Sequence, residues 1–219
     1  HLGIDQWIVF GGSWGATLAL LYAQAFKNAV SHLVLRGVFL MTRSELDWFY
    51  GGGAGKFWPE QWEKFTDPIP KDERQDLIAA YNKRLFCGNV SVETKYGQSW
   101  SNWENALASF QTNGRTASMP GPYARAFARI ENHYFLNDGF LENTNEILEN
   151  METIESIPGF IVQGRFDMIC PPKSAWDLAE CWENCDLRIV DHAGHAMSEP
   201  AISSELVRIM DLIAETIGD

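Results

Sequence analysis

Three residues that lie far apart in the chain, Ser13, Asp167 and His195, have the types and the order that nucleophilic catalysis by a serine requires. A serine hydroxyl is a weak nucleophile until a base removes its proton. The histidine that serves as base needs a carboxylate to fix its tautomer and to stabilise the imidazolium. On an open α/β sheet such a triad runs serine, acid, histidine along the chain. The three residues therefore predict acyl-transfer chemistry with Ser13 as nucleophile, His195 as base and Asp167 as acid.

The serine lies in a glycine-rich turn, Gly11-Gly12-Ser13-Trp14-Gly15, between the apolar stretch WIVF and a helix-like apolar run. A sharp turn from strand to helix forces the serine into a strained backbone, and side chains beside it would collide with neighbouring elements. The pattern G-x-S-x-G in this context predicts a nucleophile elbow. A plain glycine-rich turn with an exposed serine is the alternative. A phosphate-binding loop is excluded, because neither G-x-G-x-x-G nor a G-K-S/T ending is present.

The predicted acid and base each follow a strand-like segment. Asp167 closes "FIVQGRFD", and His195 comes directly after the strand in "LRIVDHAGH". Both are therefore expected at the carboxyl ends of strands, the edge where open α/β sheets bind their ligands. Asp167 could instead be an N-cap of the segment "PPKSAW". His192 is a rival for the base, and His195 is preferred because Gly194 lets the loop turn sharply before it.

The elements around these residues predict an α/β fold. Buried strands are expected at "WIVF", "SHLVLRGVFL", "GFIVQGRFD" and "DLRIVDHAGH", and they alternate with helices. This alternation predicts a mostly parallel sheet with helices on both faces. The core is expected to consist of residues 1–40 and 159–219.

Residues 41–158 differ in composition from the two flanking segments. They are rich in Trp, Asn and acidic residues, and they contain helical runs such as "KDERQDLIAAYNKRLF" and "YARAFARIENHYF" with little strand signal. We therefore expect a helical cap domain inserted into the α/β core.

Composition restricts the partners. The 219 residues are 46% hydrophobic and 13% aromatic, enough for a domain with a large insertion. A net charge of −12 argues against nucleic acid and favours a small or cationic partner.

Location and cofactors are predicted from what the sequence does not contain. No stretch reaches the roughly 18 to 20 apolar residues of a membrane span, and the first residues do not resemble an export signal. The four cysteines show no CxxC spacing, so neither a zinc site nor a disulfide framework is expected. These features predict a cytoplasmic protein without cofactor or metal.

Several segments together carry a family resemblance. They are "VFGGSWGATLALLYAQ", "LVLRGVFL", "SWSNWENAL", "ARIENHYF", "GRFDMICPP" and "DHAGHAMSEP". The chain is similar over nearly its whole length to the proline iminopeptidases, α/β-hydrolases that remove N-terminal proline from peptides. The resemblance implies the same roles for Ser13, Asp167 and His195 as the residue types do.

The resemblance also implies a substrate site. A free N-terminal amine is a cation, and a pair of carboxylates would bind it by charge-assisted hydrogen bonds. Glu104 and Glu131 match the family's amine-binding positions, although both could be ordinary helix-surface acids. Arg36 could balance one of these glutamates or form a structural ion pair. Phe39, Phe135 and Cys170 match the positions that line the proline-ring pocket, and Phe49 is a further candidate.

One family segment is not found in this sequence. Relatives carry an upstream HGGPG segment whose N–H groups complete the oxyanion hole with the N–H of the residue after the nucleophile, here Trp14. The chain therefore looks N-terminally truncated, and loss of one such donor can cost roughly 100- to 1000-fold in rate. The strand Trp7 to Phe10 is then expected at an uncovered sheet edge, where it would pair with a second copy or with the upstream segment.

The sequence thus predicts a serine aminopeptidase that releases N-terminal proline through an acyl-enzyme. A catalytically impaired hydrolase fragment that only binds peptide amino termini is the first alternative. An esterase or epoxide-hydrolase relative is the second, but it gives the two glutamates no role, and an epoxide hydrolase needs a carboxylate nucleophile.

Overall fold

The computed structural model describes residues 3–110 and 119–217. The chain divides into two compact units, which are described separately here. The core unit consists of His1–Thr42 and Asn143–Asp219, and the helical unit consists of Arg43–Glu142. The core unit carries the elbow, the predicted acid and the predicted base.

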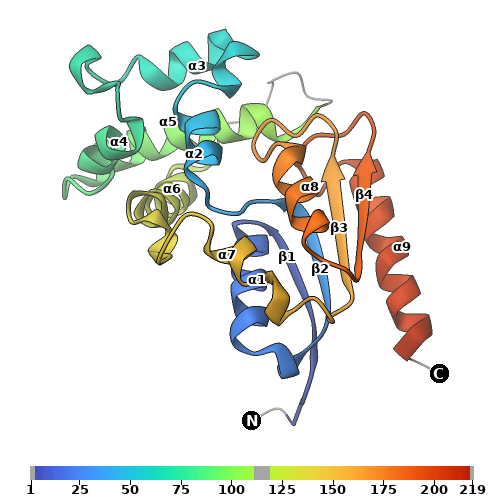
Figure 1. The fold of residues 1–219 in the computed structure, drawn as a ribbon. Helices are drawn as coiled ribbons and strands as arrows, with labels where there is room; N and C mark the ends of the chain where they lie inside the picture. The colour runs from blue at the N-terminus through green and yellow to red at the C-terminus, as the bar shows by residue number, and fades with distance from the viewer. Residues whose placement is uncertain (1–2, 111–118, 218–219) are drawn as a thin grey trace. The chain divides into compact units, whose positions relative to one another are not determined.

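The core unit is built on a parallel sheet of four strands in the order β1-β2-β3-β4 (Figure 1). The predicted fold class, an α/β fold with a parallel sheet, is therefore confirmed. Helix α1 connects β1 to β2, and α8 connects β3 to β4. The elements are β1 (Trp7–Ser13), α1 (Trp14–Ala25), η1 (Lys27–Ala29), β2 (Val30–Val38), β3 (Gly159–Gly164), α8 (Pro172–Glu180), β4 (Cys185–Val190) and α9 (Pro200–Ile217).

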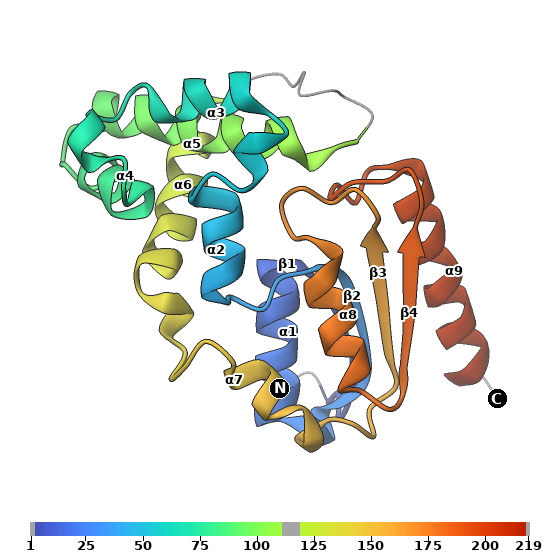
Figure 2. The same cartoon turned by 45° about the horizontal axis from the view of Figure 1, so that its top comes forward.

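Both faces of the sheet are covered by helices (Figure 2). Successive side chains of a strand point to opposite faces, so Leu33 and Leu35 of β2 pack on the side of α1 and α8. Val34, between them, packs on the side of α9 with Val162 and Ile209. This burial on both faces explains why the strands read as continuous apolar runs.

Residues 143–158 pack with the core unit, whereas the sequence predicted that the insertion continued to Pro158. Ile147, Met151 and Ile154 are buried in the same cluster as α1 and α8. The amide of Gln24 in α1 also donates to the carbonyl of Ile147 at 2.8 Å. The segment holds only α7 (Glu146–Glu149) and η5 (Met151–Thr153). Turns this short have no periodicity that could assign them to one unit.

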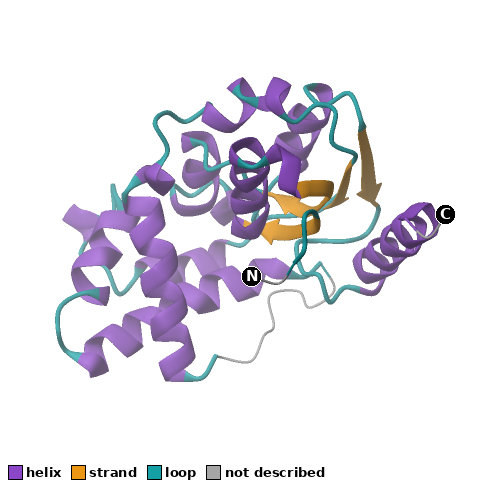
Figure 3. Ribbon diagram, turned by 90° about the horizontal axis from the view of Figure 1, so that it is seen from below, coloured by secondary structure: helices purple, strands orange, loops and turns teal. Residues whose placement is uncertain are grey.

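The described part of the helical unit contains helices and no strand (Figure 3). Its centre is a cluster of aromatic side chains, in which the ring of Phe65 stacks on those of Tyr81 and Trp103. Tyr50, Trp100 and Phe135 pack in the same cluster. The elements are α2 (Arg43–Tyr50), η2 (Ala54–Lys56), α3 (Pro59–Thr66), η3 (Lys71–Glu73), α4 (Leu77–Leu85), α5 (Val90–Ala108), α6 (Gly121–Leu136) and η4 (Asp138–Phe140).

Strand β1 is an edge strand of the sheet, as the sequence predicted. Its side chains remain partly exposed: Trp7 by 39%, Ile8 by 36% and Phe10 by 47%. Large apolar side chains on an edge strand, which is paired on one side only, form a surface that favours association with another chain.

Candidate active site

Ser13 occupies a strained turn between β1 and α1. Its backbone has φ 57° and ψ −126°, a region that residues with a side chain rarely adopt. A Cβ on Gly11 would collide with the carbonyl oxygen of Gly15, and one on Gly12 would lie 2.6 Å from Nη2 of Arg36. At Gly15 itself a Cβ would meet nothing within 4 Å. The steric reason for the flanking glycines therefore holds for Gly11 and Gly12, and Gly15 contributes through its backbone.

Helix α1 begins at Trp14, directly after the serine. The first N–H groups of a helix have no acceptor within the helix, and they lie at the positive end of its dipole. The N–H of Trp14 can therefore act as an oxyanion-hole donor. It would stabilise the negative oxygen that forms when Ser13 attacks a carbonyl. Its indole packs against the ring of Phe39, with 6.4 Å between the ring centroids.

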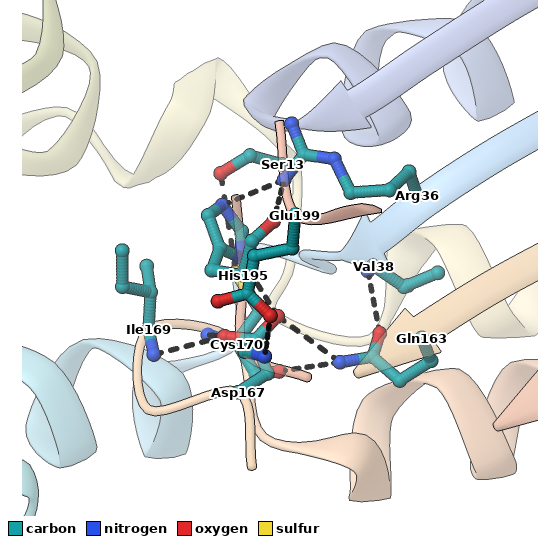
Figure 4. A network of polar contacts seen from close by, with 10 residues as sticks. Ser13, Arg36, Val38, Gln163, Asp167, Ile169, Cys170, His195 and Glu199 are labelled. Atoms are coloured by element: carbon teal, nitrogen blue, oxygen red, sulfur yellow. Dashed lines mark hydrogen bonds and ion pairs between the residues drawn. The ribbon is translucent and has the colours of Figure 1, made fainter. Parts of the chain in front are cut away.

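Asp167 and His195 form a buried hydrogen-bonded pair (Figure 4). Nδ1 of His195 lies 2.7 Å from Oδ2 of Asp167. The other carboxylate oxygen, Oδ1, accepts from the backbone N–H groups of Ile169 at 3.0 Å and Cys170 at 2.8 Å. Because the carboxylate accepts at Nδ1, that nitrogen carries the proton and Nε2 presents its lone pair. This is the tautomer that a general base requires.

The loop that carries His195 is held against the end of β3. The carbonyl of Gly194 lies where a Cβ on Gly164 would be, and the N–H of Gly194 donates to the buried carboxylate of Glu199 at 2.9 Å. The residue with a left-handed backbone in this loop is His192, at φ 57°. The chain bends at His195, directly after Gly194. His192 itself is exposed, and His195 is the histidine that contacts Asp167.

Arg36, at the end of β2, contacts His195. Its Nη1 donates to Nε2 of the imidazole at 2.9 Å and to the backbone carbonyl of His195 at 3.0 Å. Because a guanidinium only donates, this contact fits the neutral imidazole with its lone pair on Nε2. Oγ of Ser13 lies 4.0 Å from Sγ of Cys170. In this structure Nε2 is thus engaged by Arg36.

Two residues predicted to contact the substrate ring lie beside the elbow. Phe39 follows β2 and packs on Trp14, and its carbonyl accepts from the hydroxyl of Thr17 in α1 at 2.6 Å. Cys170 is buried against Ser13. Both side chains therefore border the serine within the core unit.

The two predicted amine-binding glutamates meet in the helical unit. Glu104 of α5 and Glu131 of α6 share a hydrogen bond, and Nε1 of Trp100 donates to Oε2 of Glu131 at 2.8 Å. Burial raises the pKa of Glu131 to about 7, and the two hydrogen bonds only partly offset it. Burial therefore favours the protonated form of Glu131, and Oε2 of Glu104 is buried as well.

Trp100, the donor to Glu131, belongs to the aromatic cluster of the helical unit, and so do the two phenylalanines predicted for the ring pocket. Phe135 lies against the rings of Tyr50 and Trp100, with centroids 5.6 Å and 6.4 Å away. Phe49 packs on Trp103 at 5.6 Å. Both phenylalanines are buried in this aromatic cluster.

Comparison with known proteins assigns the chain to a family. The family model of the α/β hydrolase fold matches residues 1–200. The chain is 45% identical to a proline iminopeptidase of Xanthomonas citri over 96% of its own length and 68% of that protein. It is 46% identical to a proline iminopeptidase of Arabidopsis thaliana over 94% of its own length. The chain belongs to the proline iminopeptidase family of α/β hydrolases.

Solved structures show the same fold at low identity. An α/β hydrolase from a Medee basin deep-sea metagenome library superposes with a TM-score of 0.56 at 17% identity, covering 98% of this chain and 67% of that one. A 2-hydroxy-6-oxo-6-phenylhexa-2,4-dienoate hydrolase from Rhodococcus gives a TM-score of 0.55 at 13% identity, over 96% and 65% of the two chains. The chain spans 55% of the length of the Arabidopsis relative, so it corresponds to part of a proline iminopeptidase.

Three residues of this candidate site were missed by the sequence analysis. Gln163 of β3 hydrogen-bonds to Asp167, Gly37 lies against the His195 ring, and Glu199 holds the loop of His195. Gln163 carried a signal, because it is the one polar residue in the apolar strand "GFIVQG". The contacts of Gly37 and Glu199 depend on the tertiary structure and left no pattern in the sequence.

Proposed function

We propose that this chain carries the catalytic residues of a serine aminopeptidase that releases N-terminal proline from peptides. The observation that carries the proposal is the buried Asp167–His195 pair, which lies at the carboxyl ends of β3 and β4 beside the strained Ser13 turn. The names of the curated relatives supply the substrate class.

In the proposed reaction Ser13 attacks the carbonyl of the N-terminal proline while Nε2 of His195 takes the hydroxyl proton. Asp167 stabilises the imidazolium, and the N–H of Trp14 donates to the tetrahedral oxygen. His195 then gives its proton to the leaving amine, and water releases proline from the acyl-enzyme. The first step requires Nε2 to exchange the Arg36 donor for the Ser13 hydroxyl.

For substrate selection we propose that the Glu104–Glu131 pair receives the ammonium group. A bound cation favours the ionised form of Glu131, which then gives its proton to solvent and accepts charge-assisted hydrogen bonds from the ammonium group. Phe39, Cys170 and Phe135 are proposed to contact the proline ring. A general esterase would have no use for two acids that contact each other beside Trp100, which favours the aminopeptidase.

The proposed location is the cytosol. Among residues 3–110 and 119–217, no helix is both long and apolar enough to cross a membrane. None of the four cysteines forms a disulfide, which suits a reducing compartment.

The test is proline release from a prolyl anilide by the purified chain and by Ser13→Ala. Release by the parent and none by the variant is expected. Glu131→Gln should raise KM for the prolyl anilide and leave hydrolysis of a small neutral ester unchanged. Ester hydrolysis without proline release in the parent would make the chain an esterase. A folded parent that is inactive on both substrates would leave a binding fragment.

A further inference from the structure

A buried glutamine links the predicted acid to two strands of the sheet. Gln163 is 0% exposed, and it is the next-to-last residue of β3. Its Oε1 accepts from the N–H of Val38 in β2 at 3.0 Å. Its Nε2 donates to Oδ2 of Asp167 at 3.1 Å and to the carbonyl of Cys170 at 2.9 Å. A buried amide is costly unless it is hydrogen-bonded, and here both donors and the acceptor have partners.

The hydrogen bonds to Asp167 define the plane of its carboxylate. Oδ1 accepts from two backbone N–H groups of the following turn, and Oδ2 accepts from Gln163 and from Nδ1 of His195. Rotation of the carboxylate about its terminal bond would move Oδ2 away from both of its donors. The Gln163 amide therefore opposes the rotation that would break the contact with His195 (Figure 4).

The same amide ties this carboxylate to the end of β2. Val38, which donates to Gln163, follows Gly37, the residue whose backbone lies against the His195 ring. Gln163 thus contacts the strand that supports the imidazole, the carboxylate that binds the imidazole, and the loop of Cys170. One side chain joins three separate segments that must keep their distances for the Asp167–His195 bond to form.

We propose that Gln163 is a positioning residue of the active site, which acts through Asp167 to hold His195 in its base geometry. The effect of Gln163 on catalysis rests on the proposed function. Its effect on the Asp167–His195 hydrogen bond is independent of that function. Loss of the amide is expected to lower the reactivity of Ser13 about tenfold to 100-fold, the range for removing a hydrogen bond to a buried charged group.

The first measurement compares Gln163→Met with Gln24→Met. Both substitutions remove a side-chain amide that donates to a backbone carbonyl in the core unit, but Gln24 contacts Ile147 and lies away from the triad. The readout is the second-order rate of Ser13 labelling by a fluorophosphonate, which requires an activated serine and no proline recognition. We expect a loss of about tenfold to 100-fold in Gln163→Met and the parental rate in Gln24→Met, at temperatures where both remain folded.

The second measurement is the downfield proton resonance of His195 Nδ1–H, assigned by its loss in Asp167→Asn. It should shift upfield or broaden in Gln163→Met and stay in place in Gln24→Met. This signal requires no catalysis. If the parent releases no proline but the resonance still depends on Gln163, the proposed function fails and the positioning role stands.

The third measurement is the pH dependence of labelling in Gln163→Glu. The new carboxylate would face Oδ2 of Asp167 and the carbonyl of Cys170, both acceptors. As the pH falls, the introduced carboxyl group and Asp167 together take up one proton, and this proton restores a hydrogen bond between the two side chains. The ratio of the variant's labelling rate to the parental labelling rate should therefore rise. In Gln163→Met the ratio should not depend on pH. Parental labelling and an unshifted resonance in Gln163→Met would overturn the proposal.

Discussion

The backbone of Gly37 lies directly against the imidazole of His195. A Cβ on this glycine would be 2.9 Å from both Nδ1 and Cε1 of the ring and 3.2 Å from Oδ2 of Asp167. Gly37 also has a left-handed backbone with φ 55°, and the pairing of β1 with β2 skips it. Glycine is therefore required here both by conformation and by the space that the Asp167–His195 pair occupies.

Substitution Gly37→Ala should displace the His195 ring and lower the rate of Ser13 labelling by at least about 100-fold, because loss of base geometry removes general-base catalysis. Gly88→Ala is the matched control. Gly88 also has positive φ, at 80°, but a Cβ there would meet nothing within 4 Å. The two variants should share a backbone penalty of about 1–2 kcal/mol, measured by urea unfolding. Equal labelling rates in both would show that the contact is unimportant.

The strained backbone of Ser13 predicts that residue 13 lowers the stability of the fold unless it is glycine. Ser13→Gly and Ser13→Ala should both abolish activity, but only glycine relieves the unfavourable φ and ψ. After the entropic cost of glycine, we expect Ser13→Gly to be more stable than Ser13→Ala by about 1 kcal/mol. Denaturant unfolding of the two variants decides this. Equal stabilities would mean that the turn stores no strain.

The raised pKa of Glu131 predicts a pH-dependent stability. Burial raises the pKa of Glu131 to about 7 from its usual value of 4.5, so the fold favours the protonated form. The stabilisation is complete below about pH 4.5 and is lost as the pH rises to about 7. The melting temperature of the parent should therefore fall between pH 5 and pH 8 relative to that of Glu131→Gln. Glu60→Gln, which removes an exposed carboxylate from the same unit, should follow the parent.

The exposed edge strand predicts self-association. We expect the chain to form concentration-dependent dimers or larger species in light scattering, through the apolar side chains of β1. Ile8→Lys places a charge on this edge and should shift the chain toward monomer. Val207→Lys, on the exposed face of α9, is the control that should not. A parent that stays monomeric at every concentration would contradict the prediction.

The sequence alone predicted the candidate triad and the elements that carry it. Strand and helix patterns are local, and the G-x-S-x-G turn needs only five adjacent residues, so both can be recognised without a structure. The preference for His195 over His192 agrees with the structure, because His195 contacts Asp167 and His192 is exposed. The close approach of Gly194 to Gly164 depends on the tertiary structure.

Only the tertiary structure decided how these residues are held. Val38 and Gln163 are 125 residues apart in the chain, and Arg36 and His195 are 159 apart. Such contacts follow from which strands pair and in what register, and a single sequence does not specify them locally. The same holds for residues 143–158, whose apolar side chains could have packed on either unit. The sequence therefore determined which groups can do the chemistry. Strand pairing determined which neighbouring residues hold those groups in position, because hydrogen bonds and steric contacts depend on distance in space.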